Sequence, residues 1–286
     1  MKTEEVSVVQ HGSCLGADIL GVDLAKPLDA GTFERVREAW HSNLVLRFRG
    51  QRLSDPDLVR FSSQFGELDT TPINPYGQRW LPEFPEILVL SNIVVDGKRI
   101  GGLGSDEAEW HTDMSYVDHP PMASVLYALE VPPAGGETGF ANMYVAYESL
   151  PEDLKKAVAG RYIKHDASYN SAGELRKGFS EVANPRSAPG AVHPIVRTHP
   201  DTRRKALFLG RRRNAYVEGA SLDESEALLD ALWAHVANPD LTWYQEWRVD
   251  DLLIWDNRCT LHRRNAFDPA SRRLMHRAQI RGDKPF

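Results

Sequence analysis

The chain has 286 residues, of which 42% are apolar and 26% are charged, and this composition is typical of a globular protein. The net charge of −6 argues against nucleic-acid binding, which needs a basic surface to neutralise phosphates. The polar start of the chain, the absence of an apolar run of roughly 20 residues and the presence of two cysteines predict a cytoplasmic protein without membrane association.

The first 70 residues predict a strand, a helix, a strand and a helix in that order. Leu44–Arg49 is an apolar stretch typical of a buried strand. Ser54 and Asp57 then have the spacing of a capping box, which marks the start of a helix. We expect this helix to run to about Phe65 and to stop at Gly66.

The rest of the chain predicts many short strands, because apolar and β-branched runs alternate with turn residues. Residues 95–108 are glycine-rich and polar, which is typical of a loop. Ser149 with Glu152 and Ser221 with Glu224 repeat the capping-box spacing and predict two more helices. The expected strands span residues 86–93, 122–130, 192–198, 205–210, 241–248, 251–256 and 272–281.

Many short strands with a few helices predict a mainly β fold with peripheral helices, in the form of a sandwich or barrel. Neither a linker nor a fixed repeat interrupts the chain, so we expect residues 1–286 to form a single domain. The polar stretch 166–191 lacks periodicity, and a loop of that length is a candidate lid. The basic run 211–213 is expected in an exposed turn or at an oligomer contact.

Trp110–Asp113 is the most informative segment for chemistry. Residues two apart in a strand project to the same face, so His111 and Asp113 could bind one metal ion together. An imidazole and a carboxylate suit Fe(II), and a further histidine would complete the facial triad of non-haem oxygenases. A second pattern of the same kind, His199–Asp201, contains a proline and is interpreted as a turn without a site.

Two segments near the end of the chain could complete such a site. Residues 253–262 predict a strand that runs into a turn and presents His262. In the strand expected at 272–281, Arg273, Met275 and Arg277 would share one face, and their neighbours would share the other. These arginines either point into a pocket, where they pair with carboxylates, or protect an exposed sheet edge.

The combination of motifs resembles the TauD/TfdA family of taurine and dichlorophenoxyacetate dioxygenases, which depend on Fe(II) and 2-oxoglutarate. Weaker similarity extends upstream through residues 44–68, so the resemblance covers nearly the whole chain. The motifs that carry it are Trp110–Asp113, Pro132–Thr138, Trp255–Arg258 with His262, and Arg272–Arg277.

The resemblance implies a double-stranded β-helix, or jelly roll, in which His111, Asp113 and His262 hold Fe(II). It also implies that Thr138 and Arg273 bind the distal carboxylate of 2-oxoglutarate. O2 is the second cosubstrate, succinate and CO2 are the co-products, and a small anionic substrate is hydroxylated. A carbon hydroxylated next to sulfur, oxygen or nitrogen would then release that heteroatom group.

Arg277 matches the position that pairs with the anionic group of the primary substrate in this family. Thr71, Asn74 and Glu107 stand where taurine enzymes carry histidine, tyrosine and asparagine, which argues against taurine. We expect Met114, Thr71 and Asn74 to contribute, with Arg277, to binding of the primary substrate. Sulfonates, sulfate esters, aryloxy acids and other carboxylates stay open, and a homodimer or homotetramer is expected. The segment 165–170 either lines the pocket or forms a surface loop.

Three alternatives compete with an oxygenase. A non-catalytic, cupin-like jelly roll could bind metal through the same triad, but it would not need Thr138 and Arg273 beside the metal. A zinc hydrolase could use the same ligands, although the arginines fit a keto acid better. A halogenating relative is disfavoured, because that chemistry replaces the metal-bound carboxylate and Asp113 is present.

Overall fold

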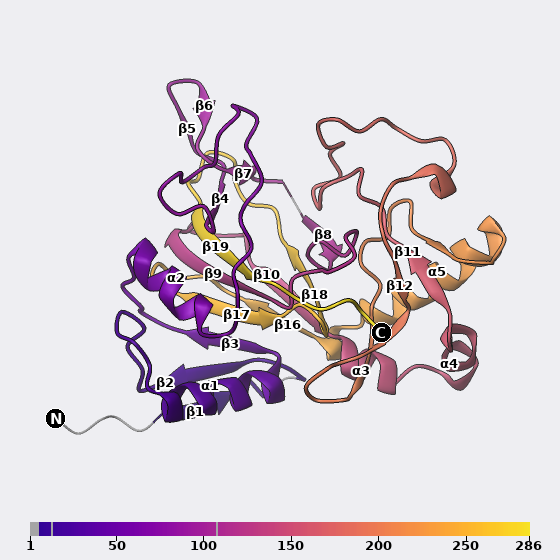
Figure 1. Cartoon of the computed structure of the whole chain (residues 1–286), viewed down its shortest axis with the longest axis horizontal. Coiled ribbons are helices and arrows are strands. Elements are labelled where there is room, and N and C mark those ends of the chain that lie inside the picture. Colours follow the sequence, from indigo (N-terminus) through magenta and orange to yellow (C-terminus); the bar gives the residue numbers. More distant parts are fainter. Residues whose placement is uncertain (1–5, 13, 107) are drawn as a thin grey trace.

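The computed structural model of the chain describes residues 6–12, 14–106 and 108–286. Two β-sheets face each other as a jelly roll, and helices cover their outer surfaces (Figure 1). This is the mainly β fold with peripheral helices that the sequence predicts. Two expectations, the polar start at residues 1–5 and the role of Glu107, lie outside the described residues.

The larger sheet has eight strands in the order β1-β2-β3-β17-β9-β19-β4-β7. Neighbouring strands pair antiparallel, except that β2 pairs with β3 and β4 with β7 in parallel. The strands are β1 (Ser7–Gln10), β2 (Ala17–Leu20), β3 (Val45–Phe48), β4 (Leu88–Ser91), β7 (Gly102–Leu103), β9 (Ala123–Glu130), β17 (Leu252–Asp256) and β19 (Leu274–Ile280).

The smaller sheet has four antiparallel strands in the order β16-β10-β18-β8. They are β8 (Ala108–His111), β10 (Thr138–Asn142), β16 (Thr242–Gln245) and β18 (Thr260–Arg264). The remaining strands form small sheets beside these two. They are β5 (Val94–Val95), β6 (Lys98–Arg99), β11 (Tyr162–Lys164), β12 (Val192–Pro194), β13 (Val196–Thr198), β14 (Lys205–Leu207) and β15 (Tyr216–Val217).

Two of the predicted capping boxes start helices. Ser54 and Asp57 cap α2, and Ser221 and Glu224 cap α5, by reciprocal bonds between side chain and backbone. Helix α2 ends two residues earlier than expected. The helices are α1 (Ala30–Asn43), α2 (Asp55–Ser63), α3 (Met143–Glu148), α4 (Glu152–Val158) and α5 (Leu222–Val236), with 3-10 turns at Pro185–Ser187 and Pro239–Leu241.

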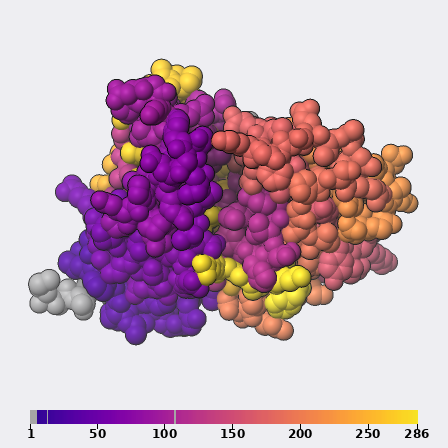
Figure 2. All heavy atoms as spheres, turned by 45° about the horizontal axis from the view of Figure 1, so that its top comes forward, coloured from indigo at the N-terminus to yellow at the C-terminus, as the bar shows by residue number. Residues whose placement is uncertain are grey.

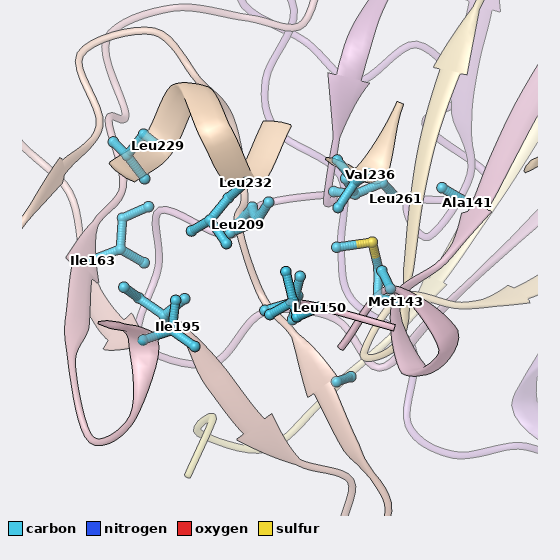
Figure 3. Packing of buried hydrophobic residues seen from close by; sticks show 14 of the residues in the cluster. Ala141, Met143, Leu150, Ile163, Ile195, Leu209, Leu229, Leu232, Val236 and Leu261 are labelled. Carbon is cyan, nitrogen blue, oxygen red and sulfur yellow. The ribbon is translucent and has the colours of Figure 1, made fainter. Parts of the chain in front are cut away.

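Apolar packing occurs in three layers. The first lies between the two main sheets, where Leu126 and Met275 of the larger sheet pack in one cluster with Phe140 of the smaller sheet. Helices α1 and α2 cover the outer face of the larger sheet. Helices α3 and α5 pack against β10, β14 and β18 through a third cluster that includes Leu232 and Leu261 (Figure 3). The sheets are therefore held from both sides.

The capping box predicted at Ser149 is wrong. Ser149 ends helix α3, and its hydroxyl donates to the carbonyl oxygen of Val145 in that helix. Helix α4 begins at Glu152 with Pro151 as its N-cap residue. The capping-box spacing arises here because two helices are joined by a short turn, so the same serine closes one helix just before the next begins.

Two other local predictions need correction. The strand expected at 192–198 is divided at Ile195: β12 pairs with β11, whereas β13 pairs with β14. Pro194 lacks the N–H that would continue the ladder, and Ile195 bonds to both neighbouring segments. The loop expected at 95–108 contains the short strands β6 and β7 and the start of β8, although it is irregular between them.

His199 lies in a turn between β13 and β14, as predicted, yet it is fully buried. Its Nδ1 accepts from the backbone N–H groups of Asp201 (3.2 Å) and Thr202 (3.1 Å). Its Nε2 therefore carries the proton and donates to Asp256 Oδ2 at 2.9 Å. The histidine therefore has a structural role, because it joins the turn to the end of β17.

Replacing His199 with alanine is therefore expected to lower the free energy of unfolding by about 1–3 kcal/mol, because buried partners lose their hydrogen bonds. Urea denaturation followed by circular dichroism measures this change. Lys205→Ala, on an exposed position of β14, is the control and should shift stability by less than about 0.5 kcal/mol. Equal stability of the two variants would contradict the structural role of His199.

Candidate metal centre and the pocket around it

A cavity of about 720 Å³ opens between the two main sheets. Its walls come from β8, β10 and β18 on one side and from β4, β9 and β19 on the other. Loop residues 69–73 and 170–179 complete the lining. These segments belong to the purple and salmon parts of the chain, which lie next to each other in Figure 2.

His111, Asp113 and His262 lie together in this cavity. The Nε2 atoms of His111 and His262 are 3.6 Å and 3.8 Å from Asp113 Oδ1. The two histidines face each other across the ladder between β8 and β18, and their ring centroids are 4.1 Å apart. The three donor atoms lie within 4.8 Å of one another and could hold a metal ion.

The local structure around these residues differs from the expectation in two ways. His111 is the last residue of β8, and Asp113 follows it in a turn rather than in the strand. His262 lies in the middle of β18, because the turn comes earlier, at residues 257–259. The carboxylate reaches the histidines because the chain bends after His111, with Met114 at a positive φ of 48°.

Neighbouring groups orient the three side chains. His111 Nδ1 is 2.7 Å from the carbonyl oxygen of Glu109, so this nitrogen donates and Nε2 is left for a ligand. Asn257 brackets the backbone of Asp113: its Oδ1 accepts from the Asp113 N–H at 2.9 Å, and its Nδ2 donates to the Asp113 carbonyl at 3.0 Å. Sequence reasoning quoted Asn257 within a motif but did not identify this function.

The electrostatics favour a divalent cation. Burial raises the pKa of Asp113, but Arg277 and the two histidines outweigh it and hold this pKa well below its usual range. Burial lowers the pKa of His111 and, still more, that of His262. The site therefore presents an ionised carboxylate and two neutral imidazoles, which are the protonation states needed for metal binding.

Arg277 contacts the same carboxylate. Its Nη1 donates to Asp113 Oδ1 and Oδ2, both at 3.1 Å, and Ser124 Oγ donates to Oδ2 at 2.9 Å. The predicted alternation along β19 is present. One face carries Arg273, Arg277 and Gln279, which line the cavity, and Met275, which packs between the sheets. On the other face, Ala278 packs in the cluster beneath α1 and α2.

A second polar group lies at one end of the cavity. Thr138 on β10 is directly opposite Arg264 on β18, and Arg273 lies just before β19 on the facing sheet. Burial and the nearby Arg264 lower the pKa of Arg273 to about 9, and burial lowers that of Arg264 to about 10. Among the described residues no carboxylate pairs with either guanidinium, and both Nε atoms lack a hydrogen-bond partner.

This arrangement fits an external carboxylate. Two cations buried so close together repel each other unless an anion lies between them. Trp247 Nε1 donates to Thr138 Oγ1 at 2.9 Å and so orients the hydroxyl towards the group. Arg264 is also held by the backbone carbonyls of Leu103 and Asp106. Sequence reasoning identified Thr138 and Arg273 but missed Arg264.

The expected substrate residues separate into two groups. Thr71 and Met114 line the cavity. Asn74 is not among the lining residues, because its side chain accepts from the N–H groups of Tyr76 and Gln78 and stabilises its own turn. Within the segment 165–170, only Asn170 lines the cavity.

The expectation for the basic run 211–213 is wrong for its first residue. Arg211 is half-buried, lines the cavity and donates from Nη1 to the carbonyl oxygen of Tyr169 at 2.7 Å. The other two arginines fit the expectation of a surface turn: Arg212 pairs with Glu226 and Asp230 of α5, and Arg213 is exposed. The contact of Arg211, which follows β14, with Tyr169 in the loop 166–191 holds it at the cavity.

A comparison with protein families matches residues 7–279 to the model described as taurine catabolism dioxygenase TauD, TfdA family. The chain is 32% identical to the pentalenolactone F synthase of Streptomyces avermitilis, over 96% of this chain and 93% of the relative. It is 33% identical to the alpha-ketoglutarate-dependent 2,4-dichlorophenoxyacetate dioxygenase of Cupriavidus pinatubonensis, over 93% of this chain and 94% of that relative.

A solved structure is also similar over the whole fold. The crystal structure of AAD-2 in complex with Mn(II) and N-oxalylglycine superimposes with a TM-score of 0.79 at 30% identity. The match covers 98% of this chain and 99% of the other. In the described part of this chain, no helix has both the length and the apolar character needed to span a membrane.

The pairing of Arg277 with Asp113 predicts a stability effect in the metal-free protein. Arg277→Gln leaves a buried carboxylate without its cation and should lower the free energy of unfolding by about 3 kcal/mol. The matched control is Arg281→Gln, since Arg281 follows the same strand but forms exposed pairs with Glu67 and Asp69 that contribute about 0–1 kcal/mol. Chemical denaturation with chelator present measures both; equal losses would disprove a buried, stabilising pair.

Proposed function

This chain belongs to the TauD, TfdA family of dioxygenases, and from that premise we propose that it is an Fe(II)- and 2-oxoglutarate-dependent enzyme that oxidises a small organic anion. The observation that carries the proposal is the presence, in one cavity, of the His111–Asp113–His262 cluster and the unpaired Arg273. The relatives are named as enzymes, one as an alpha-ketoglutarate-dependent dioxygenase and one as a synthase, which argues against a non-catalytic, cupin-like metal-binding protein.

In this proposal, His111, Asp113 and His262 hold Fe(II). Two imidazoles and one carboxylate are the donor set of non-haem oxygenases, and this set leaves coordination positions open for other ligands. When bound, the iron supplies the activation of O2 and of the keto acid that the side chains cannot supply themselves. The contribution of the chain is to orient the ligands, as Glu109 does for His111 and Asn257 does for Asp113.

Arg273 and Thr138 would bind the distal carboxylate of 2-oxoglutarate, and Arg264 would add a second cation. This places the keto-acid end of the molecule towards the metal ligands, because the arginines lie at one end of the same cavity. The carboxylate would relieve the repulsion between two buried guanidiniums, and the hydroxyl of Thr138 would complete its hydrogen bonds. Trp247 fixes the direction in which that hydroxyl points.

The primary substrate would occupy the rest of the cavity, next to Arg277, Thr71 and Met114. A volume of about 720 Å³ lies within the range of roughly 300–1,000 Å³ that small-molecule pockets have. Aryloxy acids are one candidate class, since one relative is named for 2,4-dichlorophenoxyacetate. Sulfonates, sulfate esters and other carboxylates stay open. The cytoplasmic location, the single domain, the homo-oligomer and the closing of 166–191 as a lid stay predictions.

The first test of this function concerns the metal. His111→Ala, Asp113→Ala and His262→Ala should each weaken Fe(II) binding more than about 100-fold, because losing a ligand exceeds the 10–100-fold loss typical of an outer partner. Equilibrium dialysis under anaerobic conditions measures binding, and succinate formation measures turnover. Both should be lost together in each variant.

The control for these variants is His235→Ala, because His235 lies on α5 and bonds to Ser149 and Ala146 far from the cavity. This variant should bind Fe(II) normally. The metal assignment fails if a triad variant retains full Fe(II) affinity while the control loses it.

The second test concerns the cosubstrate. Arg273→Gln should raise the 2-oxoglutarate concentration needed for half-saturation about 100-fold or more, because a buried carboxylate would lose its charged partner. The measurement is an anaerobic titration of the Fe(II) protein, followed through the visible absorption band that keto-acid chelation produces.

Adjacent Arg272 provides a matched control, since it is exposed and pairs with Glu130 on the surface. Arg272→Gln should titrate like the unmodified protein. If Arg273→Gln also titrates like the unmodified protein, Arg273 does not bind the cosubstrate.

A further inference from the structure

Tyr116 lies between two arginines at the edge of the cavity. The guanidinium carbon of Arg176 is 4.1 Å from the centroid of its ring, and that of Arg211 is 5.3 Å away. The three residues come from separate segments: Tyr116 follows the turn after Asp113, Arg176 lies in the loop 166–191, and Arg211 follows β14. All three line the main cavity.

Among the described residues, no carboxylate forms an ion pair with Arg211. Its hydrogen bond from Nη1 goes to the neutral carbonyl oxygen of Tyr169, and its buried Nε has no partner. Burial, followed by the repulsion of Arg176, lowers the pKa of Arg211 to about 10. Among the described residues no carboxylate pairs with Arg176 or Arg211. Two cations are thus held beside one aromatic ring with donors left over, which is the arrangement expected of an anion site.

Three of the other arginines of the cavity have partners or proposed ligands, and a fourth, Arg263, lies over the ring of Trp110. Arg277 donates to both oxygens of Asp113 through Nη1, and its buried Nε has no hydrogen-bond partner, so it keeps a donor for the first acidic group of the substrate. Arg273 and Arg264 form a separate group beside Thr138, where a single carboxylate suffices. The pair formed by Arg176 and Arg211 is therefore separate from these groups, and the proposed cosubstrate provides no anion for it.

Apolar side chains also line the cavity. Leu88, Leu90 and Leu126 contribute from the larger sheet, and Trp255 contributes from β17. A ligand that spans the cavity would thus need an apolar middle with charged groups at its ends. A monoanionic substrate bound at Arg277 would leave Arg176 and Arg211 unpaired.

We propose that Arg176 and Arg211 form a second anion-binding subsite and that the primary substrate carries two acidic groups separated by an apolar or aromatic spacer. One acidic group would lie near Arg277, and the second, a carboxylate or sulfonate, would pair with the guanidiniums beside Tyr116. This inference rests on the proposed function, because it assigns the substrate class of the same site.

The test measures binding without turnover. Protein loaded with Fe(II) and 2-oxoglutarate is titrated anaerobically by calorimetry with phenoxyacetate and with its analogues that carry a second carboxylate at ring position 3 or 4. At least one diacid should bind about 10–100-fold more tightly than phenoxyacetate, which is the gain expected from one charged hydrogen-bonded contact. Binding of 2-oxoglutarate is measured in the same preparation.

Variants then locate the source of this preference. Arg211→Gln and Arg176→Gln should each reduce the ratio of diacid to monoacid affinity to near one, whereas Arg211→Lys should keep part of it. The matched control is Arg212→Gln, which removes the same charge from the neighbouring residue but only breaks surface pairs with α5. It should keep the full ratio. Circular dichroism verifies that each variant is folded.

Two results would overturn the subsite. Neither diacid binds more tightly than phenoxyacetate in the unmodified protein, or Arg211→Gln weakens monoacid and diacid by the same factor, as a purely structural role would. The proposed function fails in a different way, through absent binding of 2-oxoglutarate in the unmodified protein. The two failures are thus distinguishable within one set of titrations.

Discussion

The ionised carboxylate of Asp113, buried inside the jelly roll, is the constraint on which the rest of the site depends. A buried carboxylate is stable only when cations and hydrogen-bond donors surround it. Here the donors come from distant segments: Arg277 on β19, Ser124 on β9 and, for the backbone, Asn257 after β17. Satisfying this carboxylate thus joins the smaller sheet, which carries the histidines, to the larger one. The fold and the metal centre are stabilised by the same contacts.

Positive charge is distributed through the cavity in a way that stability alone does not explain. Arg277 is matched by Asp113, but no described carboxylate forms an ion pair with Arg273, Arg264 or Arg211, although each loses hydration on burial. Such arrangements reduce stability and are retained where a ligand supplies the missing charge. Leucine side chains also line the cavity, which suits organic anions better than inorganic ions.

Short sequence motifs predicted the structure correctly where a single helix or strand contains all the residues that the motif needs. The capping boxes at Ser54 and Ser221 start helices, because the bonds of a cap involve only four consecutive residues. At Ser149 the same spacing failed, since a preceding helix already used that residue as its end. The turn before His262 comes earlier than expected because Asp256 stabilises it: its side chain accepts from the N–H of Arg258 and its carbonyl oxygen accepts from the hydroxyl of Thr260, which periodicity does not reveal.

The sequence alone determined the family resemblance, the mainly β fold and the residues that could form the triad, because motif spacing and the period of two along a strand are properties of consecutive residues. Only the tertiary structure decided which polar groups meet. It placed Arg211 inside the cavity and Asn74 in its own turn, brought Arg264 opposite Thr138, and buried His199 against Asp256. The physical reason is that burial, and with it the need of each charge for a partner, is set by segments that are remote in the chain and adjacent only after folding.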